Sequence, residues 1–337
     1  MDIEDVINEV NELDTDSSVS SESSQSNKIL KFNTSVKEFT DTGIQCYLDK
    51  ELIIPLDIYN LRNIVFAGGG ARIFSHFGFI KALEEHDLLK NINNFVGTSI
   101  GSLTALCVVL GYTTDQLINI FTRIDLLKTI DINADNIFNY FSNLGIDSGE
   151  RYIRIINILI KKKLGITNVS FKKLYEITGK RLAICVTNIS KMNSEILDLE
   201  NSPDMDIVLA IRMSCCYPYV FTPVEYNGDY YIDGGVLNNY PINYFIHDID
   251  RTIGISNQTS DTNAKIELDD ILSYTLGIIY CMSVDKQRDV TNTFQNNTVL
   301  MECMTDPINF ALTDNEKKNM VEEGYTLTKI FLRKYII

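Results

Sequence analysis

The sequence predicts an α/β fold whose sheet is at least partly parallel. Two short runs, 64–67 and 94–97, have the length and apolar character of buried strands, and glycine closes each of them. A helical pattern follows each run, over 72–86 and 103–110. Strands joined by helices in this way lie parallel in one sheet, with a right-handed crossover. The chain of 337 residues, 45% of them hydrophobic, can bury a large core without cross-links.

The N-terminal segment differs in composition from the rest of the chain. Residues 1–27 contain eight acidic residues and no lysine or arginine, and serine is frequent from Ser17 to Ser26. This composition predicts a disordered acidic, serine-rich tail, within which 3–13 could form a short helix. Residues 28–62 are expected to be an irregular lead-in with two candidate strands.

Downstream of the first two strand–helix units, helices and strands continue to alternate. We expect a helical region over 114–163, with amphipathic stretches at 114–127 and 149–163. Further helices are expected over 171–177, 206–213 and 266–284, and further strands over 181–188, 195–199, 229–232, 252–256 and 298–304. The last helix is expected to begin at Thr313 or Asp314, because both are good N-caps.

Charge and cysteine content exclude several classes of function. The net charge is −15, and no basic stripe could follow a phosphate backbone, so nucleic-acid binding is not expected. Seven cysteines are scattered, without a Cys-x-x-Cys pair or the His/Cys spacing of a metal site. An odd number of cysteines, mostly within apolar runs, indicates reduced, buried thiols and a cytoplasmic setting.

The sequence shows no signal for secretion or membrane insertion. Its acidic start lacks the basic and apolar regions of a signal peptide. The longest apolar segments, around 103–110 and 271–284, are shorter than the ~18–20 residues that a membrane span needs. We therefore expect a soluble cytoplasmic protein that could contact membranes from one side.

A serine between two glycines predicts a nucleophile. In Gly97-Thr98-Ser99-Ile100-Gly101, the serine stands where the second strand turns into its helix. Glycine is needed two residues before and two after it, because side chains there would collide in so sharp a turn. The turn lifts the serine oxygen above the sheet, beside the free N–H groups of the first helical turn.

Three consecutive glycines after the first strand predict an oxyanion hole. Gly68-Gly69-Gly70 lacks the third glycine and the strand-end acid of a dinucleotide-binding loop, and no P-loop lysine follows. Glycines can instead present backbone N–H groups to the oxygen on which charge develops during attack on a carbonyl. Arg72 could hold this loop or place positive charge near a lipid phosphate.

Asp233 ends a predicted strand and precedes Gly234 and Gly235. One interpretation is an ordinary Asp-Gly β-turn. The other is a carboxylate that accepts the Ser99 proton directly. A carboxylate is a weak base toward a hydroxyl, so this role requires hydrogen-bond reach and partial desolvation.

Taken together, these motifs resemble the patatin-like phospholipase family. The resemblance covers about 63–246 and includes two further segments, 210–223 and 238–241. It implies a three-layer α/β/α fold with a central, mainly parallel sheet. In this interpretation 63–246 is the catalytic domain, and the strands and helices of 247–337 complete the same domain.

The resemblance also implies roles for the motif residues. Ser99 would be the nucleophile and Asp233 the general base, in a dyad without histidine. The oxyanion hole would be formed by the backbone of Gly68, Gly69, Gly70, Ala71 and Arg72. The elbow and turn glycines would be Gly97, Gly101, Gly234 and Gly235. The implied reaction is phospholipase A or lysophospholipase chemistry on a phospholipid or lysophospholipid at a membrane surface. No metal or cofactor is expected, and the need for a protein activator stays open.

Ile73 departs from the family pattern, which usually has a small residue or glycine at this position. Isoleucine fits if 73 lies in the first helical turn, but not if the loop requires a positive φ. Ile73 therefore leaves open a non-catalytic binding protein on the same fold. A Ser-His-Asp hydrolase also stays open, with His247 as the histidine.

An aromatic-rich segment over 137–141 follows the elbow helix and contains Phe138 and Phe141. Such a segment could be a lid or a membrane-dipping surface, or it could be part of the core.

Overall fold

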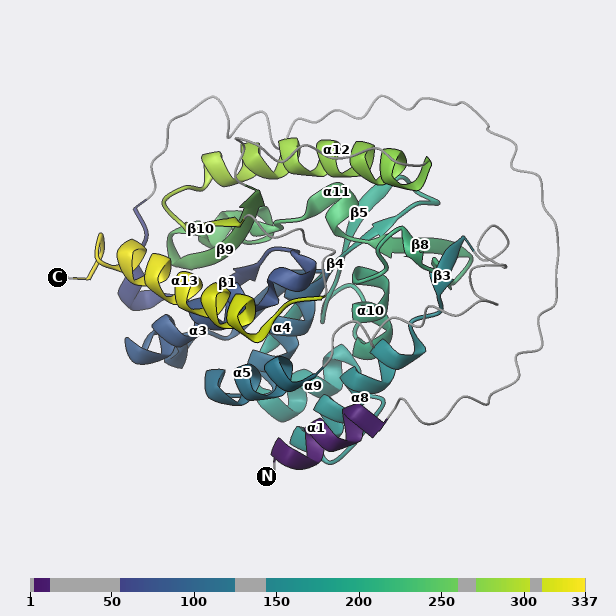
Figure 1. Ribbon diagram of the computed structural model, residues 1–337. Coiled ribbons are helices and arrows are strands. Elements are labelled where there is room, and N and C mark those ends of the chain that lie inside the picture. Colours follow the sequence, from purple (N-terminus) through teal and green to yellow (C-terminus); the bar gives the residue numbers. More distant parts are fainter. Residues whose placement is uncertain (1–2, 13–54, 125–143, 260–270, 304–310, 337) are drawn as a thin grey trace.

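The computed structural model describes residues 3–12, 55–124, 144–259, 271–303 and 311–336 (Figure 1). Its central strands are β1 (Asn63–Phe66), β2 (Asn94–Thr98), β4 (Arg181–Asn188), β5 (Asn193–Leu197), β7 (Val224–Tyr226), β8 (Asp229–Asp233), β9 (Thr252–Thr259) and β10 (Thr298–Cys303). They form one eight-stranded sheet in the order β10-β9-β1-β2-β4-β8-β7, with β5 paired to β4.

The five strands from β10 to β4 are parallel neighbours, whereas β5, β8 and β7 join by antiparallel pairing. In register, Phe66 at the end of β1 lies opposite Gly97 of β2. The glycine loop after β1 and the elbow after β2 therefore leave the sheet at the same edge. The predicted α/β class with a central, mainly parallel sheet is confirmed.

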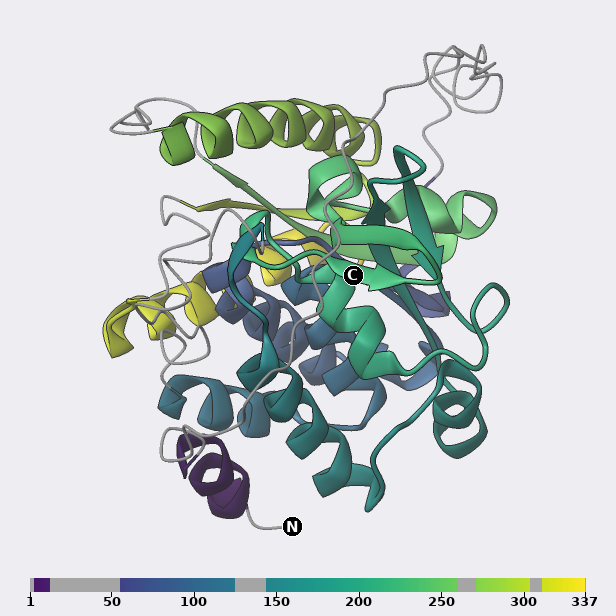
Figure 2. The same cartoon turned by 90° about the vertical axis from the view of Figure 1, so that its right-hand side faces the viewer.

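The helices are α1 (Ile3–Asn11), α3 (Ile73–Glu85), α4 (Ile100–Val109), α5 (Thr114–Arg123), α8 (Glu150–Leu164), α9 (Phe171–Thr178), α10 (Ile207–Ser214), α11 (Gly235–Asn238), α12 (Ile271–Thr293) and α13 (Asp314–Leu332). In both views α12 lies over one face of the sheet, whereas α3 and α4 lie on the opposite face (Figures 1 and 2). Helices on both faces explain why all four residues of β1 are buried.

The elbow helix α4 lies inside the helical layer rather than on its surface. Every residue from Gly101 to Val109 is buried, so its apolar character continues around the whole helix. Its neighbours in the fold include β2, β4, α3 and α10. The N-terminus of α4 is therefore fixed on several sides, which gives Ser99 a rigid support.

Residues 3–11 form α1, in agreement with the short helix considered over 3–13, and they pack on the domain instead of belonging to a disordered tail. Val6, Ile7 and Val10 lie on one helical face and are buried against α5 and α8. On the exposed side Glu4 pairs with Arg123, and Lys162 lies within 4 Å of Asp5 and Glu9. The acidic composition suggested a solvated segment, but the spacing of its few apolar residues lets them pack together.

A second difference lies within 114–163, which we expected to be helical throughout. Gly145–Asp147 forms β3, which pairs in parallel with β6 (Tyr219–Phe221). This pairing joins segments more than seventy residues apart in sequence, so no local pattern indicates it. The final helix agrees with its prediction, because Thr313 is the N-cap of α13 and forms a capping box with Glu316.

Within the ranges that the structure describes, no helix combines the length and the apolar character required to cross a membrane.

Candidate active site

The backbone turns sharply at Ser99, between β2 and α4. Ser99 has φ +52° and ψ −129°, a conformation that L-residues adopt only under strain. A Cβ at Gly97 would lie 2.4 Å from the carbonyl carbon of Gly101, and one at Gly101 would lie 2.5 Å from the carbonyl oxygen of Phe66. Both glycines are therefore required by close approach. This is the kind of sharp strand-to-helix turn that a nucleophile elbow requires.

Hydrogen bonds fix the backbone on both sides of this turn. The N–H of Ser99 donates to Ser214 Oγ at 2.8 Å, and Ser214 Oγ donates to the carbonyl of Cys185 at 2.6 Å. On the other side, Ser102 Oγ donates to the Ser99 carbonyl at 2.6 Å. The strained residue is thus held by partners on α10 and α4.

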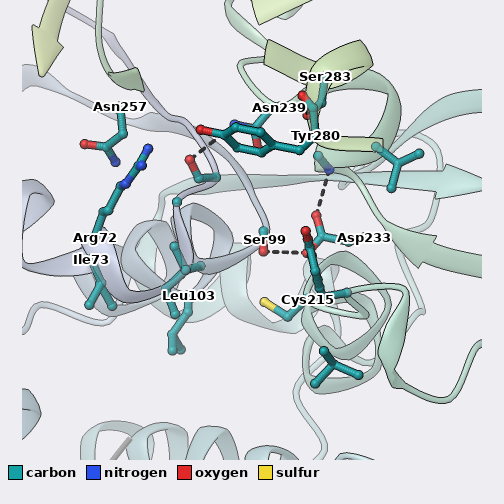
Figure 3. Close-up of a pocket in the computed structure, with 18 of the residues that line it drawn as sticks. Arg72, Ile73, Ser99, Leu103, Cys215, Asp233, Asn239, Asn257, Tyr280 and Ser283 are labelled. Carbon is teal, nitrogen blue, oxygen red and sulfur yellow. Dashed lines mark hydrogen bonds between the residues drawn. The ribbon is translucent and has the colours of Figure 1, made fainter. Parts of the chain in front are cut away.

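Asp233 lies opposite Ser99 at the end of β8. Ser99 Oγ donates a hydrogen bond of 2.6 Å to Asp233 Oδ2 (Figure 3), and Asp233 Oδ1 accepts the N–H of Gly235 at 2.7 Å. Gly234 allows the turn to approach β4, because a Cβ there would lie 2.3 Å from the carbonyl oxygen of Cys185. The structure therefore brings together two side chains that are 134 residues apart in sequence.

Burial raises the pKa of Asp233 from 3.8 to about 7, although hydrogen bonds from the Ser99 hydroxyl and the Gly235 N–H oppose the shift. The side chain is only 4% exposed, so its charged form loses most of its hydration. A carboxylate with this pKa is a stronger base than an exposed one. At neutral pH it can accept a proton from a hydroxyl that it already contacts.

The glycine loop has fewer available donors than predicted. The N–H of Gly68 donates to the Asn239 carbonyl at 2.9 Å, and the N–H of Arg72 donates to the Gly69 carbonyl at 3.0 Å. Ala71 is fully buried, whereas Gly69 and Gly70 line the cavity around Ser99. The proposed oxyanion hole is therefore narrowed to Gly69 and Gly70, because the N–H groups of Gly68 and Arg72 have partners within the protein.

The backbone angles of Gly70 and Ile73 show which of these two positions requires glycine. Gly70 has φ +53°, a conformation that favours glycine. Ile73 has φ −51° and ψ −31° and begins α3, so isoleucine fits there without strain. Ile73, which departs from the family pattern, therefore stands at a position where the backbone accepts isoleucine. It no longer favours a non-catalytic binding protein.

A largely apolar cavity opens over Ser99 and Asp233. Its apolar wall is formed by residues from α3, α4, α5, α8, α12 and the segment after α10, namely Ile73, Ile100, Leu103, Phe121, Ile155, Val220, Phe221, Ile279 and Val284. Tyr280 and Ser283 reach into it from α12 (Figure 3). Arg72 also lines the cavity, although its side chain is only 3% exposed.

None of the three histidines, all of which lie in described segments, lines this cavity. His76 is fully buried between Thr104 and Asn257, and burial lowers its pKa to about 3. His247 is exposed in the helical segment Ile242–Arg251. The structure therefore places no histidine in the cavity for the alternative Ser-His-Asp triad.

Two other expectations concern lids and metals. Phe138, Phe141 and the rest of 137–141 lie outside the described residues, so the lid stays a prediction. Within the described ranges, no group of three or more His, Cys, Asp or Glu side chains is placed to hold a metal ion.

Several polar residues of the site were not predicted from sequence, among them Ser214, Asn239 and Gln287. Ser214 and Asn239 stand in segments that carried the family resemblance, 210–223 and 238–241, but the pattern gave them no role. Gln287 lies in an α12 segment without a motif. Their contacts with the site span 48 to 171 residues of sequence, so only the folded chain identifies them.

Comparison with known proteins gives one matching family model and several similar sequences. The sequence profile described as patatin-like phospholipase matches residues 64–246. Protein R571 of Acanthamoeba polyphaga mimivirus is 32% identical over 216 residues, which are 62% of this chain and 70% of that protein. Probable lipid hydrolase 463L of Invertebrate iridescent virus 6 is 30% identical over 185 residues, 55% of this chain and 63% of that protein.

Among solved structures, VipD from Legionella pneumophila superposes with a TM-score of 0.52 at 17% identity. The match covers 82% of this chain and 67% of VipD. At this level of identity the likeness concerns the fold alone.

Proposed function

The chain belongs to the patatin-like phospholipase family, and from this premise we propose that it hydrolyses carboxylic esters of lipids through Ser99 and Asp233. The observation that carries the proposal is the 2.6 Å hydrogen bond between these side chains at the floor of an apolar cavity. A nucleophile within reach of a desolvated base is the arrangement that covalent acyl transfer requires.

In the first half of the proposed reaction, Ser99 Oγ attacks the ester carbonyl carbon while its proton passes to Asp233 Oδ2. The N–H groups of Gly69 and Gly70 stabilise the negative charge on the carbonyl oxygen. When the tetrahedral intermediate collapses, the bond to the alcohol breaks, and the alcohol leaves with the proton from Asp233. The acyl group stays on Ser99.

In the second half, water attacks the acyl-serine ester and gives a proton to Asp233. The new tetrahedral intermediate then releases the fatty acid, and Ser99 Oγ recovers its proton from Asp233. Each proton that leaves an oxygen returns to another, so no further acid or base is needed.

The proposed substrate is a phospholipid or lysophospholipid at a membrane surface. The apolar wall described above suits an acyl chain, and Arg72 on the same wall supplies a positive charge for a phosphate. We further propose that the protein is cytoplasmic and contacts membranes peripherally. Residues 63–246 would form the catalytic domain, and residues 247–337 would complete the same domain. The proposal covers cleavage at either acyl position and any phospholipid head group, with or without a protein activator.

A soluble ester tests the chemistry independently of membranes. Purified protein is incubated with p-nitrophenyl butyrate, alongside a Ser99→Ala variant. Release of nitrophenol by the unchanged protein, with loss of at least about 10³-fold in Ser99→Ala, supports the hydrolase. Absence of turnover in both proteins favours a binding protein on the same fold.

A lipid assay tests the substrate class. Membrane lipids are extracted after incubation with the unchanged protein or with Ser99→Ala, and the products are identified by mass spectrometry. The proposal predicts free fatty acid with a matching lysophospholipid or deacylated head group, only with the unchanged protein. Cleavage of neutral esters alone would move the substrate class away from phospholipids.

A further inference from the structure

The glycine loop is held by amide side chains that also line the cavity but that the proposed reaction steps do not use. The N–H of Gly68 donates to the backbone carbonyl of Asn239 at 2.9 Å. Asn239 Nδ2 donates back to the Gly68 carbonyl at 3.3 Å. Asn239 therefore binds the peptide groups on both sides of Gly68, just before the residues proposed to form the oxyanion hole.

Asn257 of β9 braces the other part of the loop. A Cβ added at Gly69 would lie 2.8 Å from Asn257 Nδ2, so the two residues are in close contact. Asn257 Oδ1 accepts from Ser75 Oγ at 2.8 Å, and that hydroxyl also lies 2.8 Å from the carbonyl oxygen of Arg72. Asn257 is only 3% exposed. The loop from Gly68 to Arg72 is thus supported along its length.

Gln287 of α12 connects these two supports. Its Oε1 accepts from Asn239 Nδ2 at 2.7 Å, and its Nε2 donates to the backbone carbonyl of Asn257 at 3.0 Å and to Ser256 Oγ at 2.8 Å. A carbonyl oxygen can only accept, so the amide has one orientation that satisfies all three partners. Gln287 is 7% exposed and lies outside the matched residues 64–246.

We propose that Gln287 is a positioning residue that holds the oxyanion hole in place from α12. The inference rests on the proposed function. Without this amide, Asn239 and Asn257 lose the partner that they share. The N–H groups of Gly69 and Gly70 are then no longer held in one orientation. Displacement of a catalytic group by 1 Å can cost about 10²-fold in rate. The loss should appear in kcat, because the oxyanion exists only after attack.

The main test replaces the amide by an apolar side chain of similar length, Gln287→Met. With p-nitrophenyl butyrate, kcat should fall about 10- to 100-fold and KM should stay within about twofold. The rate at which a fluorophosphonate labels Ser99 should fall by a similar factor, because its phosphoryl oxygen takes the place of the oxyanion. Gln287→Glu, which keeps the acceptor and removes the donors, should lower kcat as well.

Thr291→Val is the matched control. Thr291 lies one turn further along α12, is 3% exposed and also contacts Ser256 Oγ, at 3.2 Å, but does not bond to Asn239. Its kcat and labelling rate should stay within about twofold of the unchanged protein. Circular dichroism of each variant checks that it folds, and Gln287→Glu serves the test if Gln287→Met does not fold.

A double-mutant cycle identifies the route of the effect. If Gln287 acts through Asn239, the variant carrying both Gln287→Met and Asn239→Ala loses no more activity than the worse single variant. Full kcat in folded Gln287→Met and Gln287→Glu would overturn the proposal. An effect confined to KM would also overturn it, because Gln287 would then contact the substrate. So would a double variant whose loss of kcat is the product of the two single losses, because Gln287 would then not act through Asn239.

Ser99→Ala in the same assays separates the two proposals. Full turnover by Ser99→Ala would overturn the proposed function and, with it, the role of Gln287. Loss of turnover in Ser99→Ala together with full kcat in the Gln287 variants would overturn the positioning role alone.

Discussion

At the scale of single residues, the carboxyl of Asp233 should set the pH dependence of the activity. Burial raises its pKa to about 7, and only the ionised form can take the Ser99 proton. We predict that kcat/KM for a soluble ester rises about tenfold per pH unit below pH 7 and levels off above it. A pH–rate profile from pH 5 to 9 checks this. A plateau that extends down to pH 5 would contradict it.

The same carboxyl should also affect stability. Between pH 4 and 7 the folded state keeps a proton on Asp233 that the unfolded state has lost, so this residue makes stability fall as the pH rises. Asp233→Asn removes the buried charge. We predict that its Tm advantage over the unchanged protein grows by at least about 2 °C from pH 5 to pH 8. Calorimetry of both proteins checks this, and an advantage independent of pH would contradict it.

His247 is the residue that distinguishes the dyad from a triad. It is exposed and does not line the cavity, so His247→Ala should keep ester hydrolysis within about twofold. Asp233→Asn should lower it at least about 10²-fold, because a general base contributes 10² or more. Parallel kinetics of the two variants decide the matter. Large losses in His247→Ala with retained activity in Asp233→Asn would favour the triad.

Sequence predicted those residues of the site whose roles depend on the local backbone. A Cβ at Gly97 would collide with the backbone of Gly101 in the same turn, and one at Gly101 would collide with the backbone at the end of β1. Both constraints act on fixed positions around Ser99, so they leave a pattern in the sequence. Ser214 and Gln287 act through hydrogen bonds to residues distant in sequence. Their side-chain types are common in helices without any such role, so nothing in the sequence singles them out.

At the scale of elements, α1 is the part whose contribution is easiest to isolate. Its buried face packs on α5 and α8, and Ile7 is only 1% exposed. Ile7→Asp would place an unpaired charge in that interface, which is strongly unfavourable. We predict a Tm lower by at least about 2 °C, with kcat for a soluble ester within about threefold.

The matched control for this prediction is Asn8→Ala, because Asn8 is exposed on the same helix, next to Ile7 in sequence. Its Tm should stay within about 1 °C of the unchanged protein. Equal Tm values for Ile7→Asp and the unchanged protein would show that α1 does not dock in solution.

The elements themselves were predictable where a strand or helix carries its own pattern. Arg181–Asn188 and the helix capped by Thr313 agree closely with expectation. The short strand Gly145–Asp147 was missed, because it owes its conformation to pairing with Tyr219–Phe221. The docking of α1 was missed because acidic composition outweighed three apolar residues in the prediction.

At the scale of the whole molecule, the sheet is what brings the site together. The glycine loop and Ser99 follow neighbouring parallel strands, whereas Asp233 arrives on an antiparallel strand beside β4. The order of the motifs predicted a parallel sheet, but not that β8 would enter it in the opposite direction. Helix α12 lies over the face of the sheet opposite to α3 and α4 (Figure 2). Its side chains line part of the cavity over Ser99, and no sequence motif marks them.

The central claim is that Ser99 forms the covalent bond to the acyl group. Its most direct test treats the protein with a fluorophosphonate and locates the adduct by mass spectrometry of peptides. The account predicts an adduct on Ser99, a parallel loss of ester hydrolysis, and no adduct in Ser99→Ala. Continued hydrolysis by fully labelled protein, or an adduct on a different side chain that accounts for the loss, would contradict it.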